Sequence, residues 1–269
     1  MMMLDEPYRW AEAVANRRDY IEDQLGSGSP VVGLNYRDGA LLLTLGRGQQ
    51  KIFEVYDRIA MGAVGHPTDI EKLRQAAIDL AHVIGFNYSE ADVTLQQIVH
   101  FGLGPAMKTA FDEIVRSPYI ARVLLVELED PGKAIVLYTV DYDGGFLRTD
   151  KQGALGGIPE ADRVMQRYLA EADTGRLGLR DALDLALRAW AAGRWAGQLE
   201  EMPNEASDLD RAADEADVTG VLRDALGSLE VEAAVLQRSR TRKNKFRTLA
   251  SREIAPVISA YRGSKPAGD

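Results

Sequence analysis

Few residues of this chain have the types and spacing that catalysis or metal binding requires. The sequence has no cysteine, which excludes thiolate chemistry and disulfide bonds. His82 lies in a predicted helix without a second ligand beside it, and a lone histidine is more often a polar surface or core residue than a metal ligand. Gly156-Gly157-Ile158-Pro159 precedes another predicted helix but lacks the Lys and Ser/Thr of a P-loop. We therefore expect neither a metal ion nor a cofactor.

The strongest charge feature is a basic run near the C-terminal end. Six basic residues occur there without an intervening acid, at Arg238, Arg240, Arg242, Lys243, Lys245 and Arg247. Such a run is usually a solvated turn, although it could contact an acidic segment of a neighbouring molecule or bind a phosphate or nucleic acid. The net charge of −9 argues against general nucleic-acid binding, so we expect no nucleic-acid partner.

The elements that would position a site begin with two hairpins. Residues 29–36 and 40–45 are apolar runs separated by Arg37-Asp38-Gly39, where glycine supplies the positive φ of a tight turn. Residues 51–56 alternate in polarity, and residues 59–65 are small and apolar enough for a strand buried on both faces. We therefore predict four short strands before any long core helix.

Helices are predicted on either side of these strands. The first starts near Pro7 and has an apolar face made of Trp10, Val14, Ile21 and Leu25. After the strands, Thr68 and Glu71 form a capping box for a helix that Gly85 ends. Thr94 and Gln97 repeat this capping pattern for a second helix. The first helix either packs on its own domain or serves assembly, while the other two form one helical layer.

The second half returns to strands and then to helices. Three strands are predicted, at residues 121–127, 134–141 and 146–148. The turn signals Asp130-Pro131-Gly132 and Asp143-Gly144-Gly145 separate them. Small residues at 154–157 end the sheet and let a helix over about residues 160–171 approach it closely. A fourth helix presents an apolar face of Leu179, Leu183, Leu187 and Trp190.

Composition is that of an ordinary soluble domain. The 269 residues are 46% apolar, which is enough to fill a sizeable core. No apolar run approaches the roughly 20 residues needed to cross a bilayer. The first six residues carry acid where the basic region of a signal peptide would lie. We therefore expect a cytoplasmic protein that has no membrane partner.

The order of these elements resembles the core of the proteasome family, and its α-type subunits more than its β-type. The segments VVGLNYRDGALLL and KIFEVYDRIAMGAVG, followed by a helix, carry the resemblance. It covers residues 7–192 and resumes at residues 229–236. The resemblance implies an α+β fold: a four-layer αββα sandwich of two antiparallel sheets, of the N-terminal nucleophile hydrolase type, with an extra N-terminal helix.

The α-type resemblance also implies how the chain would assemble. In α-type subunits, the helix before the first strand helps to pack one ring on the next, and a short tail ahead of it gates the axial pore. Residues 1–6 would then form the gate. Its apolar members, which could close the pore by contact, are Met1, Met2, Met3 and Leu4.

A docking pocket is implied for an activating partner. Lys51 and Gly65 are fourteen residues apart, the spacing that α-type subunits show between the Lys and Gly lining a pocket between neighbours. In the family the Lys pairs with the C-terminal carboxylate of a regulatory ATPase. Alternatively, Lys51 only caps a strand edge and Gly65 only permits close packing. His66 departs from the neutral apolar residue that is usual there, so docking could depend on pH.

A catalytic alternative rests on Ser29. In β-type subunits a Thr at the start of the first strand is the nucleophile, assisted by a Lys on the third strand and an Asp at the end of the second. Ser29 takes the place of the Thr, Gly28 precedes it and Lys51 is present. However, Leu45 occupies the Asp position, and Pro30 follows the serine. We therefore favour a structural role for Ser29.

Taken together, the resemblance predicts a non-catalytic α-type subunit. It would form a seven-membered homo-oligomeric ring, stack on β-type proteasome subunits, admit protein substrates and dock the C-terminus of a regulatory ATPase. One alternative is a self-compartmentalised hydrolase with Ser29 as nucleophile and Lys51 tuning its amine. Another is a free-standing adaptor that keeps the fold but remains a monomer.

The predicted boundaries follow from these segments. Residues 1–28 are the tail and assembly helix, and residues 29–195 are the αββα core. Residues 196–228 form a largely solvated acidic insert, with nine acidic and two basic residues. Residues 229–262 hold the last strands and the C-terminal helix, and residues 263–269 are a disordered tail.

Overall fold

The structure is a computed structural model that describes residues 6–113, 115–129, 135–199, 201–203 and 205–262. Its strands are β1 (Val31–Tyr36), β2 (Gly39–Gly46), β3 (Ile52–Tyr56), β4 (Ile59–Gly65), β5 (Ala121–Leu128), β6 (Ile135–Val140), β7 (Phe146–Thr149), β8 (Gln152–Leu155), β9 (Glu230–Gln237) and β10 (Phe246–Thr248). Its α-helices are α1 (Glu6–Gly26), α2 (Pro67–Asn87), α3 (Leu95–Ile98), α4 (Gly104–Asp112), α5 (Pro159–Ala170), α6 (Leu179–Ala196), α7 (Ala206–Glu215), α8 (Val218–Leu226) and α9 (Ser251–Arg262). Shorter helical turns are η1 (Glu90–Asp92), η2 (Val99–Leu103) and η3 (Thr174–Arg176). The two predicted hairpins are therefore confirmed as β1–β2 and β3–β4.

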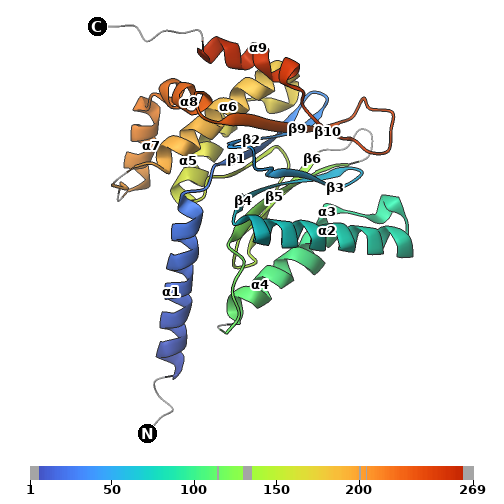
Figure 1. The fold of residues 1–269 in the computed structure, drawn as a ribbon, viewed down its shortest axis with the longest axis vertical. Helices are drawn as coiled ribbons and strands as arrows, with labels where there is room; N and C mark the ends of the chain where they lie inside the picture. The colour runs from blue at the N-terminus through green and yellow to red at the C-terminus, as the bar shows by residue number, and fades with distance from the viewer. Residues whose placement is uncertain (1–5, 114, 130–134, 200, 204, 263–269) are drawn as a thin grey trace.

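The strands form two antiparallel sheets that lie face to face between helical layers (Figure 1). One sheet has the order β10-β9-β2-β1-β8, and the other has the order β3-β4-β5-β6-β7. Helices α5, α6, α8 and α9 cover the first sheet, and α2, α3 and α4 cover the second. This arrangement confirms the predicted αββα sandwich.

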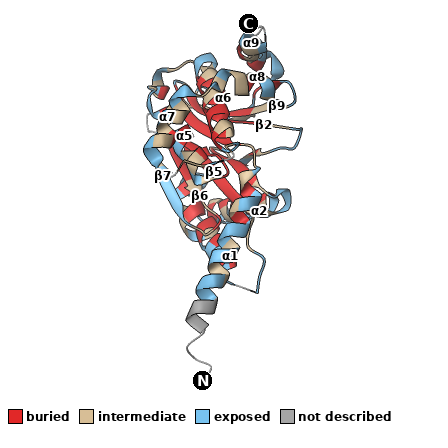
Figure 2. Ribbon diagram, turned by 90° about the vertical axis from the view of Figure 1, so that its left-hand side faces the viewer, coloured by how far each residue is buried: buried red, intermediate tan, exposed pale blue. Residues whose placement is uncertain are grey.

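Among the described residues, three apolar clusters fill the spaces between these layers, and a fourth lies among α5, α6 and α7. Strand β2 supplies two of them, because its side chains alternate between the faces of the sheet. Leu41, Leu43 and Leu45 face the helices together with Trp190, whereas Leu42 faces the other sheet. The third cluster lies between the second sheet and its helices. Figure 2 shows the buried strands at the centre of the molecule, as expected for a sheet that is covered on both sides.

Helix α1 is anchored at one end and projects from the body at the other (Figures 1 and 2). Ile21 and Leu25 are fully buried, whereas Trp10 is 53% exposed and Tyr20 is 54% exposed. The Arg17 guanidinium donates to the carbonyl oxygens of Ala110, Phe111 and Arg116, at 3.0, 2.8 and 2.6 Å. This residue ties the middle of α1 to the end of α4, and Val14, Ile21 and Leu25 pack the same side of the helix on the cluster between the sheets.

The predicted start of α2 was wrong. His66 is the N-cap, and its Nδ1 accepts a hydrogen bond from the Thr68 N–H at 3.3 Å. Pro67 takes the first helical turn, while Glu71 bonds to Arg74 at 2.6 Å and not back to the cap. Thr68 therefore lies inside the helix, two residues too late to be its cap.

The predicted end of α2 was also wrong. The helix runs two residues past Gly85, to Asn87. A Cβ at Gly85 would lie 2.5 Å from the Tyr56 hydroxyl, so this glycine permits the helix to approach β3. The second capping pair is confirmed in part: the Gln97 N–H donates to Thr94 Oγ1 at 3.4 Å, but the Gln97 side-chain oxygen makes no return bond.

The acidic segment at 196–228 is better packed than we predicted. Leu209 of α7 is buried near α5, and Leu222 and Leu226 of α8 are buried beside α6. On the outer side, the guanidinium of Arg163 pairs with Asp210 at 2.7 Å. Although its charged groups lie at the surface, the segment forms part of the helical layer over the first sheet.

The basic run leads into β10 and finds acids within the same chain. Lys243 pairs with Glu90 at 2.5 Å, and Arg247 pairs with Glu253 at 2.9 Å. The Ser239 hydroxyl donates to Asp38 at 2.6 Å. These contacts hold the turn against η1, the β1–β2 turn and α9, which agrees with a structural turn.

Candidate assembly and docking site

Ser29 lies between α1 and β1, and its hydroxyl is engaged on both sides. It donates to the Leu45 carbonyl oxygen at 2.5 Å and accepts from Trp190 Nε1 at 3.1 Å. Trp190 is fully buried, so this bond satisfies an indole N–H that water cannot reach. The geometry suits a serine that joins β1, β2 and α6.

Lys51 lies immediately before β3, and its main chain is fixed on two sides. Its carbonyl oxygen accepts from the Ala63 N–H of β4 at 3.1 Å. Its own N–H donates to the Glu232 carboxylate at 2.9 Å, and the Ile52 N–H donates to the same carboxylate at 2.8 Å. Burial lowers the pKa of the half-buried Lys51, with the charge of Glu232 acting in the opposite direction.

Gly65 is the last residue of β4 and lies two positions beyond Ala63, whose N–H bonds to Lys51. Two residues of a strand span about 7 Å, so Gly65 lies about that far along β4 from Ala63. Its φ of +137° is strained for any residue with a side chain. A Cβ there would lie 2.2 Å from the Ile120 carbonyl oxygen and 2.6 Å from Ala121 Cα. The glycine is therefore required by the contact between β4 and β5, whatever else it does.

His66 follows Gly65 and borders a cavity of about 630 Å³ under α1. The cavity is lined by residues of α1, α2, α4 and the segment before β5, among them Tyr20, Lys72 and Arg116. Because the His66 ring caps α2, the docking role predicted for it would compete with a structural one.

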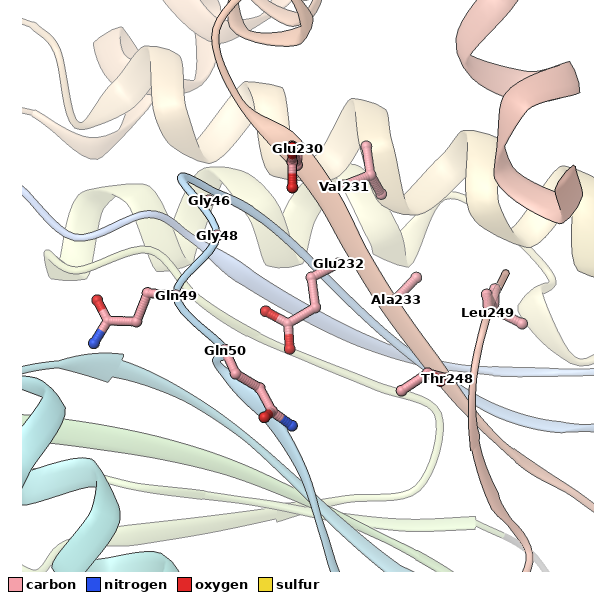
Figure 3. Close-up of a pocket in the computed structure, with 10 residues that line it drawn as sticks. All are labelled: Gly46, Gly48, Gln49, Gln50, Glu230, Val231, Glu232, Ala233, Thr248 and Leu249. Carbon is pink, nitrogen blue, oxygen red and sulfur yellow. The ribbon is translucent and has the colours of Figure 1, made fainter. Parts of the chain in front are cut away.

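A second cavity, of about 400 Å³, lies on the side of Glu232 (Figure 3). It is bounded by the loop after β2, the start of β9 and the end of β10. Its polar lining includes Gln49 and Gln50, which directly precede Lys51 in the sequence. It also includes Glu232, which accepts a hydrogen bond from the Lys51 N–H. Lys51 lines neither this cavity nor the one beside His66, but its main chain adjoins Glu232.

Comparison with known proteins identifies the fold. The sequence pattern of the family described as "Proteasome subunit" matches residues 26–195, more than half of the chain. This chain belongs to the proteasome subunit family.

Its proteasome relatives are bacterial proteins named "Proteasome subunit alpha". One from Streptomyces avermitilis is 25% identical over 260 residues, covering 96% of this chain and 91% of the relative. One from Mycolicibacterium vanbaalenii is 27% identical over 262 residues, covering 96% and 91%. One from Acidothermus cellulolyticus is 30% identical over 186 residues, covering 68% and 79%. The prediction of a non-catalytic, α-type proteasome subunit is thereby confirmed.

The predicted site residues have different outcomes. Lys51 lies immediately before β3 and Gly65 ends the neighbouring strand β4, and their docking role stays a prediction. His66 borders a cavity that Lys51 does not line. The predicted gate residues Met1, Met2, Met3 and Leu4 lie outside the described residues.

Sequence reasoning missed Glu232, which is the acid that contacts the main chain of Lys51. The strand pattern holds a signal for it, because residues 232, 234 and 236 of β9 share one face. Ala234 and Leu236 belong to the cluster between the sheets. An acid in that row must be partly buried, and a buried carboxylate needs partners.

Two further observations bear on ligands and membranes. Among the residues that the structure describes, no three His, Asp or Glu side chains gather closely enough to hold a metal ion. In the same residues, no helix combines the length and apolar character that a membrane span requires.

Proposed function

We propose that this chain forms the seven-membered outer ring of a cytoplasmic proteasome-like particle. The ring stacks on β-type peptidase subunits, and protein substrates enter through its pore. The observation that supports this proposal best is α1, which precedes the first strand and leaves Trp10 and Tyr20 exposed. Exposed aromatic side chains on a projecting helix favour contact with another subunit over a role in the core of one chain.

The tail ahead of α1 gates the pore in this proposal. Deleting residues 1–6 should raise the hydrolysis of long peptides by the particle reconstituted with its β-type subunits, while ring assembly stays unchanged. The reason is that the anchoring contacts of α1 among the described residues, at Val14 and Arg17 and beyond, lie outside the deleted segment. Hydrolysis of a dipeptide substrate, which needs no open gate, is the control. Unchanged hydrolysis of long peptides would refute the gate.

Lys51 docks the terminal carboxylate of a regulatory ATPase in this proposal. The main chain of Lys51, and not its ammonium, makes the bonds to Ala63 and Glu232. Replacement of Lys51 by Ala should therefore leave folding nearly unchanged. It should nevertheless weaken binding, because the peptide carboxylate would lose its counter-charge.

Fluorescence anisotropy tests this docking directly. The probes are fluorescently labelled peptides that match the last ten residues of each regulatory ATPase encoded in the same genome. Each peptide is made twice, once with a free C-terminal carboxylate and once with a C-terminal amide. We expect the wild-type ring to bind the carboxylate at least about tenfold more tightly than either the amide or the Lys51→Ala ring does. Lys108→Ala is the matched control, because Lys108 is an exposed lysine of α4. Equal affinities for wild type and Lys51→Ala would mean that Lys51 does not dock the peptide.

A further inference from the structure

Glu232 reaches Lys51 from the opposite sheet. It belongs to β9, in the sheet that contains β1 and β2, whereas Lys51 precedes β3 of the other sheet. Its two carboxylate oxygens accept from the Lys51 N–H at 3.1 and 2.9 Å, and one also accepts from the Ile52 N–H at 2.8 Å. One acid therefore fixes the main chain on which the lysine is mounted.

The charges of Glu232 and Lys51 also influence each other. The ionised carboxylate favours the ammonium form of Lys51 against the burial that lowers its pKa. Burial in turn raises the pKa of Glu232, although the bonds from Ile52 and Lys51 oppose this effect. A partner's carboxylate arriving at Lys51 would thus meet a second negative charge.

Few other charged groups surround this pair. The positive charge of Arg194, a residue of α6, disfavours the ammonium form of Lys51 and so lowers its pKa. On β9, the exposed Glu230 lines the same cavity as Glu232. The loop after β2 contributes Gln49 and Gln50, which are neutral, as are the residues from the end of β10 (Figure 3). Glu232 is therefore the titratable group of this cavity that bonds to the segment carrying Lys51.

We propose that Glu232 is the internal counter-ion of Lys51, and that a partner's terminal carboxylate docks more tightly when Glu232 is protonated than when it is ionised. The inference rests on the docking role proposed for Lys51. Glu232 acts through Lys51 as a positioning residue, because its bonds are to the main chain of residues 51 and 52. Acidification then strengthens docking, since the competing charge disappears while the peptide carboxylate remains ionised.

Glu232→Gln tests the competition, because an amide keeps an acceptor for the two N–H groups but has no charge. We expect wild type to bind the peptide carboxylate at least about twofold more tightly at pH 5.5 than at pH 7.5, because Glu232 takes up a proton more readily as the pH falls toward its raised pKa. The Glu232→Gln ring should bind tightly at both values. Glu230→Gln, two residues earlier on the same strand, should behave like wild type.

A second measurement needs no partner. Acetylation of Lys51 by a small amine-reactive ester, followed by mass spectrometry at pH 8, reports how much free amine is present. Loss of the Glu232 charge lowers the lysine pKa, so Glu232→Gln should be acetylated about threefold faster than wild type. The exposed Lys151 is the internal standard.

The outcomes separate the two claims. Equal acetylation rates, or an equal pH dependence of binding in wild type and Glu232→Gln, would overturn the role of Glu232 and leave docking intact. If no ring binds the peptide at either pH, the docking role of Lys51 fails, and the inference fails with it even where acetylation rates differ.

Discussion

Replacement of Gly65 by Ala should destabilise the fold strongly, before any effect on docking can be read. The new Cβ would lie 2.2 Å from the Ile120 carbonyl oxygen, which accepts the His66 N–H at 2.7 Å. Because the obstacle is backbone, β4 or β5 must shift and the ladder between them must weaken. Strain at φ +137° contributes about 1–3 kcal/mol, and the forced displacement contributes a similar amount. We therefore expect a loss of about 2–6 kcal/mol in the free energy of unfolding.

Gly48→Ala is the matched control. Gly48 also has a positive φ, of +86°, but nothing lies within 4 Å of its Cβ position. It should cost only the conformational strain, about 1–2 kcal/mol. Urea denaturation followed by circular dichroism measures both variants against wild type. If Gly65→Ala were as stable as Gly48→Ala, the steric argument would be refuted, and Gly65 would be better explained as the floor of a pocket.

The remaining predictions concern α1, Ser29 and Glu232. Arg17→Ala should lower stability by about 1.5–3 kcal/mol and speed proteolysis within α1. Its control, Arg18→Ala, loses an exposed ion pair at 3.7 Å and should change stability by less than about 1 kcal/mol. Thermal unfolding and limited proteolysis compare the two variants. Ser29→Ala should lower the free energy of unfolding by about 1–3 kcal/mol, because Trp190 Nε1 loses its acceptor. It should leave peptide hydrolysis by the reconstituted particle unchanged. Lost hydrolysis would favour the hydrolase alternative. Glu232→Gln should flatten the pH dependence of the free energy of unfolding. The pKa of Glu232 in the folded state is raised above the ordinary 4.5, so its contribution to wild-type stability is present below pH 4.5 and is lost as pH rises through the raised pKa. Identical slopes of unfolding free energy against pH, measured by urea titration, would contradict this.

The order of elements could be predicted because it depends on local patterns. Alternating or continuous apolar runs and Asp-Gly turns determine β1 to β4, and the structure has them within one or two residues of the predicted bounds. The pairing of the two sheets came from the family resemblance, since periodicity alone does not say which strands are neighbours.

The helix ends were predicted less well, because competing local solutions are close in energy. At α2, a histidine followed by proline displaced the expected Thr68 cap. Gly85 did not end the helix, because its contact with Tyr56 of β3 depends on tertiary packing. Both errors arise where a residue has a local preference and a packing role at once.

The polar contacts that organise the site could not be predicted, because they join distant segments. Glu232 is 181 residues from Lys51, and Arg17 is 93 residues from Ala110. Sequence spacing carries no information about such pairs. What the sequence does show is an acid in a strand row that faces another sheet, which is a reason to look for its partner.

Native mass spectrometry of this chain, co-expressed with a β-type subunit from the same genome, tests the central claim most directly. We predict particles that contain rings of seven copies of this chain together with β-type subunits, each copy retaining the segment before Ser29. A monomer that binds no β-type subunit, or copies that begin at Ser29, would contradict the account.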